Sequence, residues 1–253
     1  MSGLRKPLIA GNWKMHKTVA ETRAYISELR TLPLPLDAVD AVICPPFTAL
    51  AAARDELRGT QVGLGAQNVN WAPQGAFTGE ISAPMLAELG VRWVVIGHSE
   101  RRALFGELDF RVNEKARIAL EHGVTPIVAV GETEGQHAAG TARDTVCMQV
   151  SAAFAGIPAA KIARCVVAYE PIWAIGTGRA DTPESANAIM GEIRRAVDGL
   201  QNVRILYGGS VNPANIASFV AQPEIDGALC GGASLQPASF AGLLDGAARG
   251  AAQ

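Results

Sequence analysis

One stretch of the chain sets the pattern for the whole fold: Val167-Ala-Tyr-Glu-Pro-Ile-Trp-Ala-Ile-Gly-Thr-Gly178. Residues 166–168 predict a short buried strand, and Glu170 comes just past its end. Pro171 fixes φ and stiffens the chain after this carboxylate, whereas the glycines let a ligand approach the backbone because no Cβ obstructs it. The stretch therefore predicts a base beside a movable lid that excludes water, formed by Pro171, Ile172, Trp173, Ala174, Ile175, Gly176, Thr177 and Gly178.

Similar apolar runs recur along the chain about every thirty residues. The eight runs are residues 8–10, 41–44, 62–66, 93–96, 126–130, 166–168, 204–206 and 227–230. Helix-like segments separate them, among them residues 19–30 and 111–122, and a further helix is expected to start at Pro183 with Thr182 as its cap. Continuous apolar strands that alternate with helices predict a parallel sheet, which is either an open doubly wound sheet or a closed barrel. Eight similar units without a linker favour an α/β fold, a (β/α)8 barrel that spans residues 1–253 as a single domain.

The composition narrows the classes of protein to which the chain can belong. It has 253 residues, a formal net charge of −2 and 49% hydrophobic residues. The balanced charge argues against a surface for nucleic acid or anionic membrane, and the longest apolar runs are too short to span a bilayer. The four cysteines are widely spaced, without a Cys-x-x-Cys pair, which argues against a zinc site or a disulfide framework. We expect a cytoplasmic protein with no metal, no nucleic-acid partner and no membrane partner.

In a (β/α)8 barrel the chemistry belongs on the loops that follow the strands. Asn12 and Lys14 follow the first predicted strand, and glycine pairs follow the seventh and eighth at 208–209 and 231–232. Either pair alone is consistent with a tight turn. Together, in the last two units, they favour a phosphate site built from backbone N–H groups.

Lys14 is the expected cation of this face. A lysine is ordinarily a solvated surface residue, but Lys14 stands between two apolar residues directly after a strand. The other cations that follow strands are Arg101 and Arg102, and both are expected to pair with Glu100.

His98 and Glu170 complete the candidate chemistry. His98 reads either as a core histidine or, at the first turn of a helix, as a neutral ring that donates a hydrogen bond. Glu170 reads either as a turn cap or as a base whose basicity is raised by apolar neighbours such as Ile175 and Leu229. A carboxylate base, a neutral histidine and a lysine fit proton abstraction beside a carbonyl. We expect the remaining histidines at the surface without a catalytic role: His16, His122 and His137.

Five segments together resemble the triosephosphate isomerase family. They are Gly11-Asn-Trp-Lys-Met15, Gly97-His-Ser-Glu-Arg-Arg102, Ala168-Tyr-Glu-Pro-Ile-Trp-Ala-Ile-Gly-Thr-Gly178, Tyr207-Gly-Gly-Ser210 and Gly231-Gly-Ala-Ser-Leu235. They occur in order from the first predicted strand to the last and leave no sizeable extra segment. Each is moderately specific, and five in sequence are very specific.

The resemblance implies cofactor-independent interconversion of dihydroxyacetone phosphate and D-glyceraldehyde 3-phosphate through an enediolate, in glycolysis and gluconeogenesis. It implies that Glu170 moves a proton between two carbons, that neutral His98 shuttles protons at the oxygens with help from Asn12, and that Lys14 stabilises the negative charge. It also implies the substrate- and phosphate-binding residues, which are Asn12, Lys14, Gly176, Ser210, Gly231 and Gly232.

The resemblance further implies a homodimer. Residues 67–80, whose tip is too apolar for a loop lying alone in water, resemble the segment that crosses the family's subunit interface. Thr78 would support Asn12 and His98 of the partner subunit, and Glu80 would pair with Arg101 of the partner subunit. The implied interface residues are Gln67, Thr78, Glu80 and Arg101.

Four residues at three places depart from the family's usual pattern. Ala129 stands where a cysteine is usual, and Cys230 replaces a more usual valine beside the phosphate glycines. At the second end of the lid Arg179 and Asp181 replace a lysine and an alanine. None of these departures removes a catalytic residue.

Two other functions fit part of the pattern. Another phosphate-binding barrel enzyme, acting on a sugar phosphate or an indole precursor, would share the glycines of the last two strands without needing Lys14, His98 and Glu170. A non-catalytic binding or surface-adhesion protein on this fold would need none of those three side chains, although an added binding role could coexist with catalysis.

Overall fold

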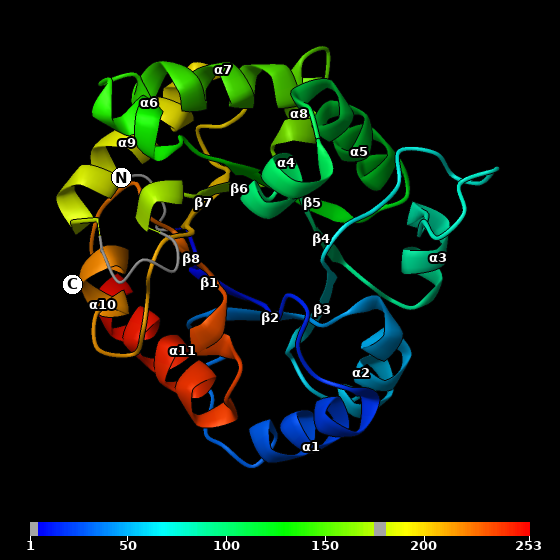
Figure 1. Cartoon of the computed structure of the whole chain (residues 1–253). Helices are drawn as coiled ribbons and strands as arrows, with labels where there is room; N and C mark the ends of the chain where they lie inside the picture. The colour runs from blue at the N-terminus through cyan, green and yellow to red at the C-terminus, as the bar shows by residue number, and fades with distance from the viewer. Residues whose placement is uncertain (1–4, 175–180) are drawn as a thin grey trace.

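A closed barrel of eight parallel strands forms the centre of the molecule (Figure 1). The computed structural model describes residues 5–174 and 181–253. The strands are β1 (Leu8–Asn12), β2 (Asp40–Cys44), β3 (Gly63–Ala66), β4 (Trp93–Ile96), β5 (Thr125–Val130), β6 (Val166–Tyr169), β7 (Arg204–Tyr207) and β8 (Gly227–Cys230). They pair in sequence order, and β1 closes the barrel on β8 with Leu8 opposite Gly227. The expected (β/α)8 barrel is confirmed, and the open doubly wound sheet is excluded.

The helices surround the barrel (Figure 1). The α-helices are α1 (Val19–Leu29), α2 (Leu50–Glu56), α3 (Ala83–Glu88), α4 (Ser99–Phe105), α5 (Asp109–Glu121), α6 (Glu134–Ala138), α7 (Ala142–Phe154), α8 (Ala159–Ile162), α9 (Pro183–Ala196), α10 (Ile216–Val220) and α11 (Pro237–Ala251). Short 3-10 helices are η1 (Phe47–Ala49), η2 (Ile172–Ala174) and η3 (Gly232–Ser234). The Thr182 side chain caps α9 as expected, by accepting from the N–H of Ser185. None of the helices within the described ranges has the length and apolar character that a membrane crossing requires.

The strands are buried on both faces, which explains their continuous apolar runs. Along β1, Leu8 and Ala10 join a small apolar cluster inside the barrel, whereas Ile9 joins the large cluster between the barrel and the helices. Asn12 has the same parity as Leu8 and Ala10, so its side chain faces the barrel interior at the carboxyl end. This strand extends two residues beyond the predicted end because residues 8–12 pair with β2 throughout.

A buried ion pair between Glu107 and Lys115 stabilises the segment after β4. Glu107 accepts hydrogen bonds from the Gly97 N–H at 2.8 Å, from Arg101 Nε at 2.8 Å and from Lys115 Nζ at 2.6 Å. Lys115 also donates to Asn68 Oδ1, at the start of the long loop after β3. Burial raises the pKa of Glu107, but Lys115 and Arg101 outweigh it and hold that pKa below its ordinary value. The pair therefore ties the ends of β3 and β4 to α4 and α5.

Replacing Lys115 with methionine should destabilise the protein strongly. Both side chains of the pair are only 3% exposed, so the substitution leaves Glu107 as a buried charge with one partner fewer. We expect a loss of about 3–5 kcal/mol in the free energy of unfolding, measured by urea denaturation. Lys161→Met, on the exposed face of α8, is the control and should change it by less than about 0.5 kcal/mol. Equal denaturation midpoints for the two variants would contradict this role of the pair.

Candidate active site

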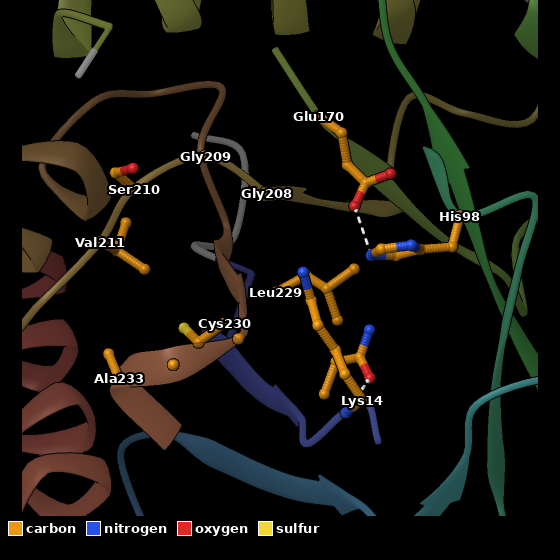
Figure 2. Close-up of a pocket in the computed structure, with 13 residues that line it drawn as sticks. Lys14, His98, Glu170, Gly208, Gly209, Ser210, Val211, Leu229, Cys230 and Ala233 are labelled. Atoms are coloured by element: carbon orange, nitrogen blue, oxygen red, sulfur yellow. Dashed lines mark hydrogen bonds and ion pairs between the residues drawn. The ribbon is translucent and has the colours of Figure 1, made fainter. Parts of the chain in front are cut away.

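A cavity of about 280 Å³ opens where the carboxyl ends of the strands meet, a size that suits a small ligand. Residues from β1, β4, β6, β7 and β8 or the loops that follow them line it (Figure 2). They are Asn12, Lys14, His98, Glu170, Gly208, Gly209, Ser210, Val211, Leu229, Cys230, Gly231, Gly232 and Ala233. The fold thus brings together every catalytic and phosphate-binding residue expected from the sequence except Gly176, which lies outside the described residues.

The Glu170 carboxylate contacts two hydrogen-bond donors that follow β4. Its Oε1 lies 2.9 Å from His98 Nε2 (Figure 2), and its Oε2 accepts the Ser99 N–H at 2.9 Å. Glu170 and His98 are both buried. A buried carboxylate is stable only when donors compensate for the water it has lost. Ser99, which the sequence interpretation did not single out, therefore supplies part of the site's electrostatics through its backbone.

The pKa values of this pair differ from the sequence expectation. Burial raises the pKa of Glu170, but the contacts with His98 and Ser99 outweigh burial, so its pKa lies below the ordinary value. Burial lowers the pKa of His98, but the facing carboxylate outweighs this effect and raises that pKa. We expected a base made stronger by apolar neighbours and a histidine kept neutral by a helix end. Direct contact between the two groups reverses both directions in this arrangement.

The His98 ring is oriented by the first turn of α4. The Glu100 N–H donates to His98 Nδ1 at 3.2 Å. In the neutral ring, Nδ1 is therefore the acceptor and Nε2 carries the proton that points into the cavity. His98 can accordingly act as a hydrogen-bond donor toward a ligand oxygen.

Lys14 is held in an uncommon backbone conformation, with φ of 52°. Its N–H donates to Asn12 Oδ1 at 3.0 Å, and its carbonyl accepts from Gln67 Nε2 at 2.9 Å. The Lys14 amine pairs with Glu100 at 2.7 Å and extends toward the last glycines, because a Cβ added to Gly231 would lie 3.9 Å from Nζ. Backbone strain held by neighbours in this way is typical of functional residues.

The expectation that Arg101 and Arg102 pair with Glu100 is wrong. Arg101 instead pairs with Glu107, and Arg102 pairs with Asp109 while donating to the carbonyls of Gly97 and Ala129. The sequence could not reveal this exchange because Glu107 and Asp109 lie beyond the end of α4. Glu100 therefore forms its ion pair with Lys14 and not with either arginine.

Glycines let the backbone pack directly against the base. A Cβ at Gly131 would lie 1.8 Å from the Glu170 carbonyl oxygen, and one at Gly208 would lie 2.8 Å from Glu170 Cγ. The Gly208 N–H donates to the Tyr169 carbonyl at 2.7 Å. Ends of β5 and β7 thus fix the backbone of Glu170 from both sides, while its side chain faces the cavity.

The first half of the expected lid, residues 171–174, is anchored to the barrel. The Ile172 N–H donates to the Glu132 carbonyl, and the Ala174 carbonyl accepts from the Ser210 hydroxyl at 2.9 Å. Trp173 Nε1 donates to the fully buried carboxyl group of Glu132 at 2.7 Å. Glu132 follows β5, and the local sequence does not link it to Trp173, which lies 41 positions further along the chain. The remaining lid residues lie outside the described part of the chain: Ile175, Gly176, Thr177 and Gly178.

The expected interface residues occupy two settings. Gln67 is half-buried and donates to the carbonyls of Lys14 and Cys44, so it joins the ends of β1 and β2. Thr78 and Glu80 lie on the exposed loop between β3 and α3, which projects from the barrel in Figure 1. Arg101 pairs within the chain, as described above.

The structure describes Ala129, Cys230 and Asp181 among the departures from the family pattern, whereas Arg179 lies outside the described residues. Ala129 is fully buried inside the barrel, and Cys230 lines the cavity with its pKa raised to about 12 by burial, which disfavours a reactive thiolate. Asp181 is nearly buried, and burial also raises its pKa. Over residues 5–174 and 181–253 we found no cluster of three or more side chains suited to a metal ion.

Comparison with known proteins gives one consistent family. The sequence profile described as triosephosphate isomerase matches residues 7–247. The chain is 49% identical over 256 residues to a triosephosphate isomerase of Symbiobacterium thermophilum, covering 99% of this chain and 100% of that protein. It is 52% identical over 247 residues to a triosephosphate isomerase of Chloroflexus aurantiacus, covering 95% of this chain and 99% of that protein. A triosephosphate isomerase of Solibacter usitatus is 50% identical over 248 residues, covering 96% of this chain and 100% of that protein.

Replacing Glu170 with glutamine should lower the pKa of His98. The substitution removes the carboxylate that raises this pKa but leaves the ring buried, so we expect the value to fall below that of an ordinary histidine. The measurement is an NMR titration of the imidazole resonances. Glu100→Gln is the control and should cause a smaller fall, because Glu100 is 45% exposed and its charge is screened. An unchanged His98 titration in Glu170→Gln would show that the contact does not control the ring.

Proposed function

The chain belongs to the triosephosphate isomerase family, and from this premise we propose that it interconverts dihydroxyacetone phosphate and D-glyceraldehyde 3-phosphate through an enediolate. The reaction is a step of glycolysis and gluconeogenesis and needs no cofactor. The observation that carries the proposal is the pairing of a buried carboxylate with a buried imidazole at one cavity wall, with a lysine on the opposite loop. These groups supply a base, a proton donor and a cation around a single small ligand.

In the proposed reaction the Glu170 carboxylate takes a proton from the carbon next to the substrate carbonyl. The carbonyl oxygen becomes negatively charged as the enediolate forms. His98 Nε2–H donates to that oxygen, the Asn12 amide assists, and the Lys14 ammonium stabilises the charge. Glu170 then returns the proton to the former carbonyl carbon, while His98 passes the hydroxyl proton of the first carbon to the former carbonyl oxygen. Each preorganised donor is worth roughly 2.7–4 kcal/mol in such sites, so the charge is shared among several groups.

The contact between Glu170 and His98 supports a change of basicity on substrate binding. In the arrangement seen here His98 and Ser99 lower the pKa of Glu170 and keep it ionised. To reach a substrate carbon the carboxylate must leave both donors while it stays buried, and burial alone raises its pKa. His98 at the same time loses the charge that raises its own pKa, so the neutral ring becomes the favoured donor. The substrate thereby meets a strong base and a neutral acid.

We assign the phosphate to the loops after β7 and β8. Ser210, Gly231 and Gly232 line this side of the cavity, and glycine allows an anion to approach the backbone N–H groups closely. Lys14 extends to the same place, since its Cε lies 3.3 Å from a Cβ built at Gly231. Gly176 is proposed as a further phosphate contact from the family pattern alone.

Glu170→Gln tests both the reaction and its base. We expect a fall of about 10²- to 10⁴-fold in kcat, because an amide cannot accept the proton. The measurement is a coupled isomerase assay on glyceraldehyde 3-phosphate with both proteins purified identically. Glu121→Gln, an exposed residue of α5, is the control and should keep full activity. Activity in neither wild type nor control would contradict the proposed function and direct attention to other phosphorylated carbonyl compounds.

We further propose that the active form is a homodimer located in the cytoplasm. Large apolar side chains are exposed on the loops that would meet a partner, with Met15 96% exposed and Phe77 38% exposed. Lys14 is next to Met15, so a partner that covers Met15 would also stiffen the strained Lys14. The loop of Thr78 and Glu80 carries the remaining proposed contacts, to Asn12, His98 and Arg101 of the partner subunit. The free cysteines, three of them buried, suit a reducing compartment.

Thr78→Arg should separate the subunits and reduce activity. A long charged side chain at the tip of the loop between β3 and α3 cannot be accommodated in a packed interface. We expect a monomer in sedimentation velocity and a fall in kcat of at least about tenfold, since one misplaced catalytic group costs that much or more. Ser151→Arg, on the exposed face of α7, should remain dimeric and active. A soluble Thr78→Arg monomer with full activity would overturn the dimer proposal.

A further inference from the structure

We propose that His137 is a positioning residue which, when protonated, holds Trp173 and the adjoining Glu170 in the arrangement seen here. The proposal rests on the proposed function, since it concerns the base of that reaction. Sequence interpretation assigned His137 to the surface without a role. His137 is indeed exposed, but its ring lies against the indole of Trp173. The two residues are far apart in the sequence and meet only in the folded structure.

The geometry around Trp173 links three elements. The rings of His137, on α6, and Trp173, on η2, are stacked with centroids 4.2 Å apart and an interplanar angle of 29°. Trp173 Nε1 donates to Glu132 Oε1 at 2.7 Å, and His137 Nδ1 lies 3.6 Å from the same oxygen. The indole is therefore held on its edge by a buried carboxyl group after β5 and on its face by an imidazole.

Acidic groups dominate the surroundings of His137. The side chain of Glu132 is fully buried, and its Oε2 has no hydrogen-bond partner among the described residues. Asp181, which precedes α9, interacts electrostatically with His137 and also has an unpartnered oxygen, Oδ2. The other titratable groups here are Tyr169 on β6, which donates to Glu132, Tyr207 on β7, whose pKa is raised by burial and then by Asp181, and Glu134 on α6 itself.

A cation on His137 lies beside carboxyl groups. Its Nδ1 is 3.6 Å from Glu132 Oε1, and Asp181 interacts with the ring electrostatically. On α7, the helix that follows α6, Arg143 pairs with Glu192. The His137 side chain is 43% exposed, so solvent reaches the ring.

Protonation strengthens the stacked arrangement in two ways. An imidazolium is attracted to the face of an indole, and it pairs with the carboxylate of Glu132 at 3.6 Å. Both attractions are present while the ring is protonated and are lost when the ring is neutral. Trp173 is therefore held more firmly by the protonated ring.

The chain between Glu170 and Trp173 is stiff, so a contact that fixes Trp173 also affects Glu170. Pro171 fixes φ between Glu170 and η2, and the Ile172 N–H and Ala174 carbonyl are both bonded to the barrel. In this proposal, release of Glu170 from His98 and Ser99 is coupled to a rearrangement of the residues that follow it. A protonated His137 thus favours the state in which Glu170 rests on His98, and a neutral His137 releases it.

Tryptophan fluorescence of the free enzyme tests the contact without any substrate. A protonated imidazole quenches a stacked indole more strongly than a neutral one, so the wild-type emission should fall as pH decreases through the histidine range. The step should disappear in His137→Gln and in Trp173→Phe, and persist in His122→Gln, whose Nδ1 lies 3.0 Å from the Ile118 carbonyl oxygen of α5. An identical step in His137→Gln would overturn the proposal.

The pH dependence of kcat/KM tests the consequence for the base. His137→Gln and wild type should agree at pH 8, and the variant should exceed wild type by about 2- to 5-fold at pH 5.5, the size of one cation–π contact. Encounter with substrate limits the fastest enzymes, so the comparison uses the reaction direction with the lower kcat/KM. His137→Arg, which is always charged, should be slow at both pH values. Parallel profiles for all variants would overturn the positioning role, whereas inactivity of every protein including wild type would overturn the proposed function and leave the fluorescence result standing.

Discussion

The contact between the Glu170 carboxylate and the His98 ring is the constraint on which the site depends. A carboxylate that is 2% exposed cannot remain ionised without donors, and His98 Nε2 and the Ser99 N–H provide them. Removing one partner of such a buried pair costs several kcal/mol. In this arrangement the base is therefore held against the acid. A ligand that takes over the His98 hydrogen bond releases the carboxylate at the point where it is needed.

The barrel explains why this contact can form. Glu170 follows β6 and His98 follows β4, and the intervening strand β5 brings Gly131 directly beneath the Glu170 carbonyl. Side chains from strands far apart in sequence meet because all parallel strands end at the same face. The buried Glu107, bonded to the Gly97 N–H, then fixes the turn that presents His98. The side chains of Glu170 and His98 are positioned mainly by the packing of the backbone around them. Buried side-chain hydrogen bonds support that backbone.

The sequence predicted the parts of the molecule that depend on local pattern. Apolar runs located all eight strands within a few residues, and their spacing predicted closure. Residues directly after strands identified Asn12, Lys14, His98 and Glu170, because strand ends are where this fold carries its chemistry.

Contacts between loops could not be predicted from local sequence pattern. The partners of Lys14 and Arg101 depend on how α4 and α5 pack, and the stacking of His137 on Trp173 joins positions on separate elements. The pKa directions of Glu170 and His98 were wrong for the same reason, since each was judged alone and the two residues touch.

The most direct test is a crystal structure with a phosphorylated carboxylate that mimics the planar enediolate. In that complex the Glu170 carboxylate should have left His98 Nε2 and the Ser99 N–H and should lie beside the ligand carbons. His98 Nε2 should donate to a ligand oxygen, with the phosphate on the loops of Ser210 and Gly231. A ligand bound in the cavity while Glu170 still contacts His98 would overturn the proposed release of the base.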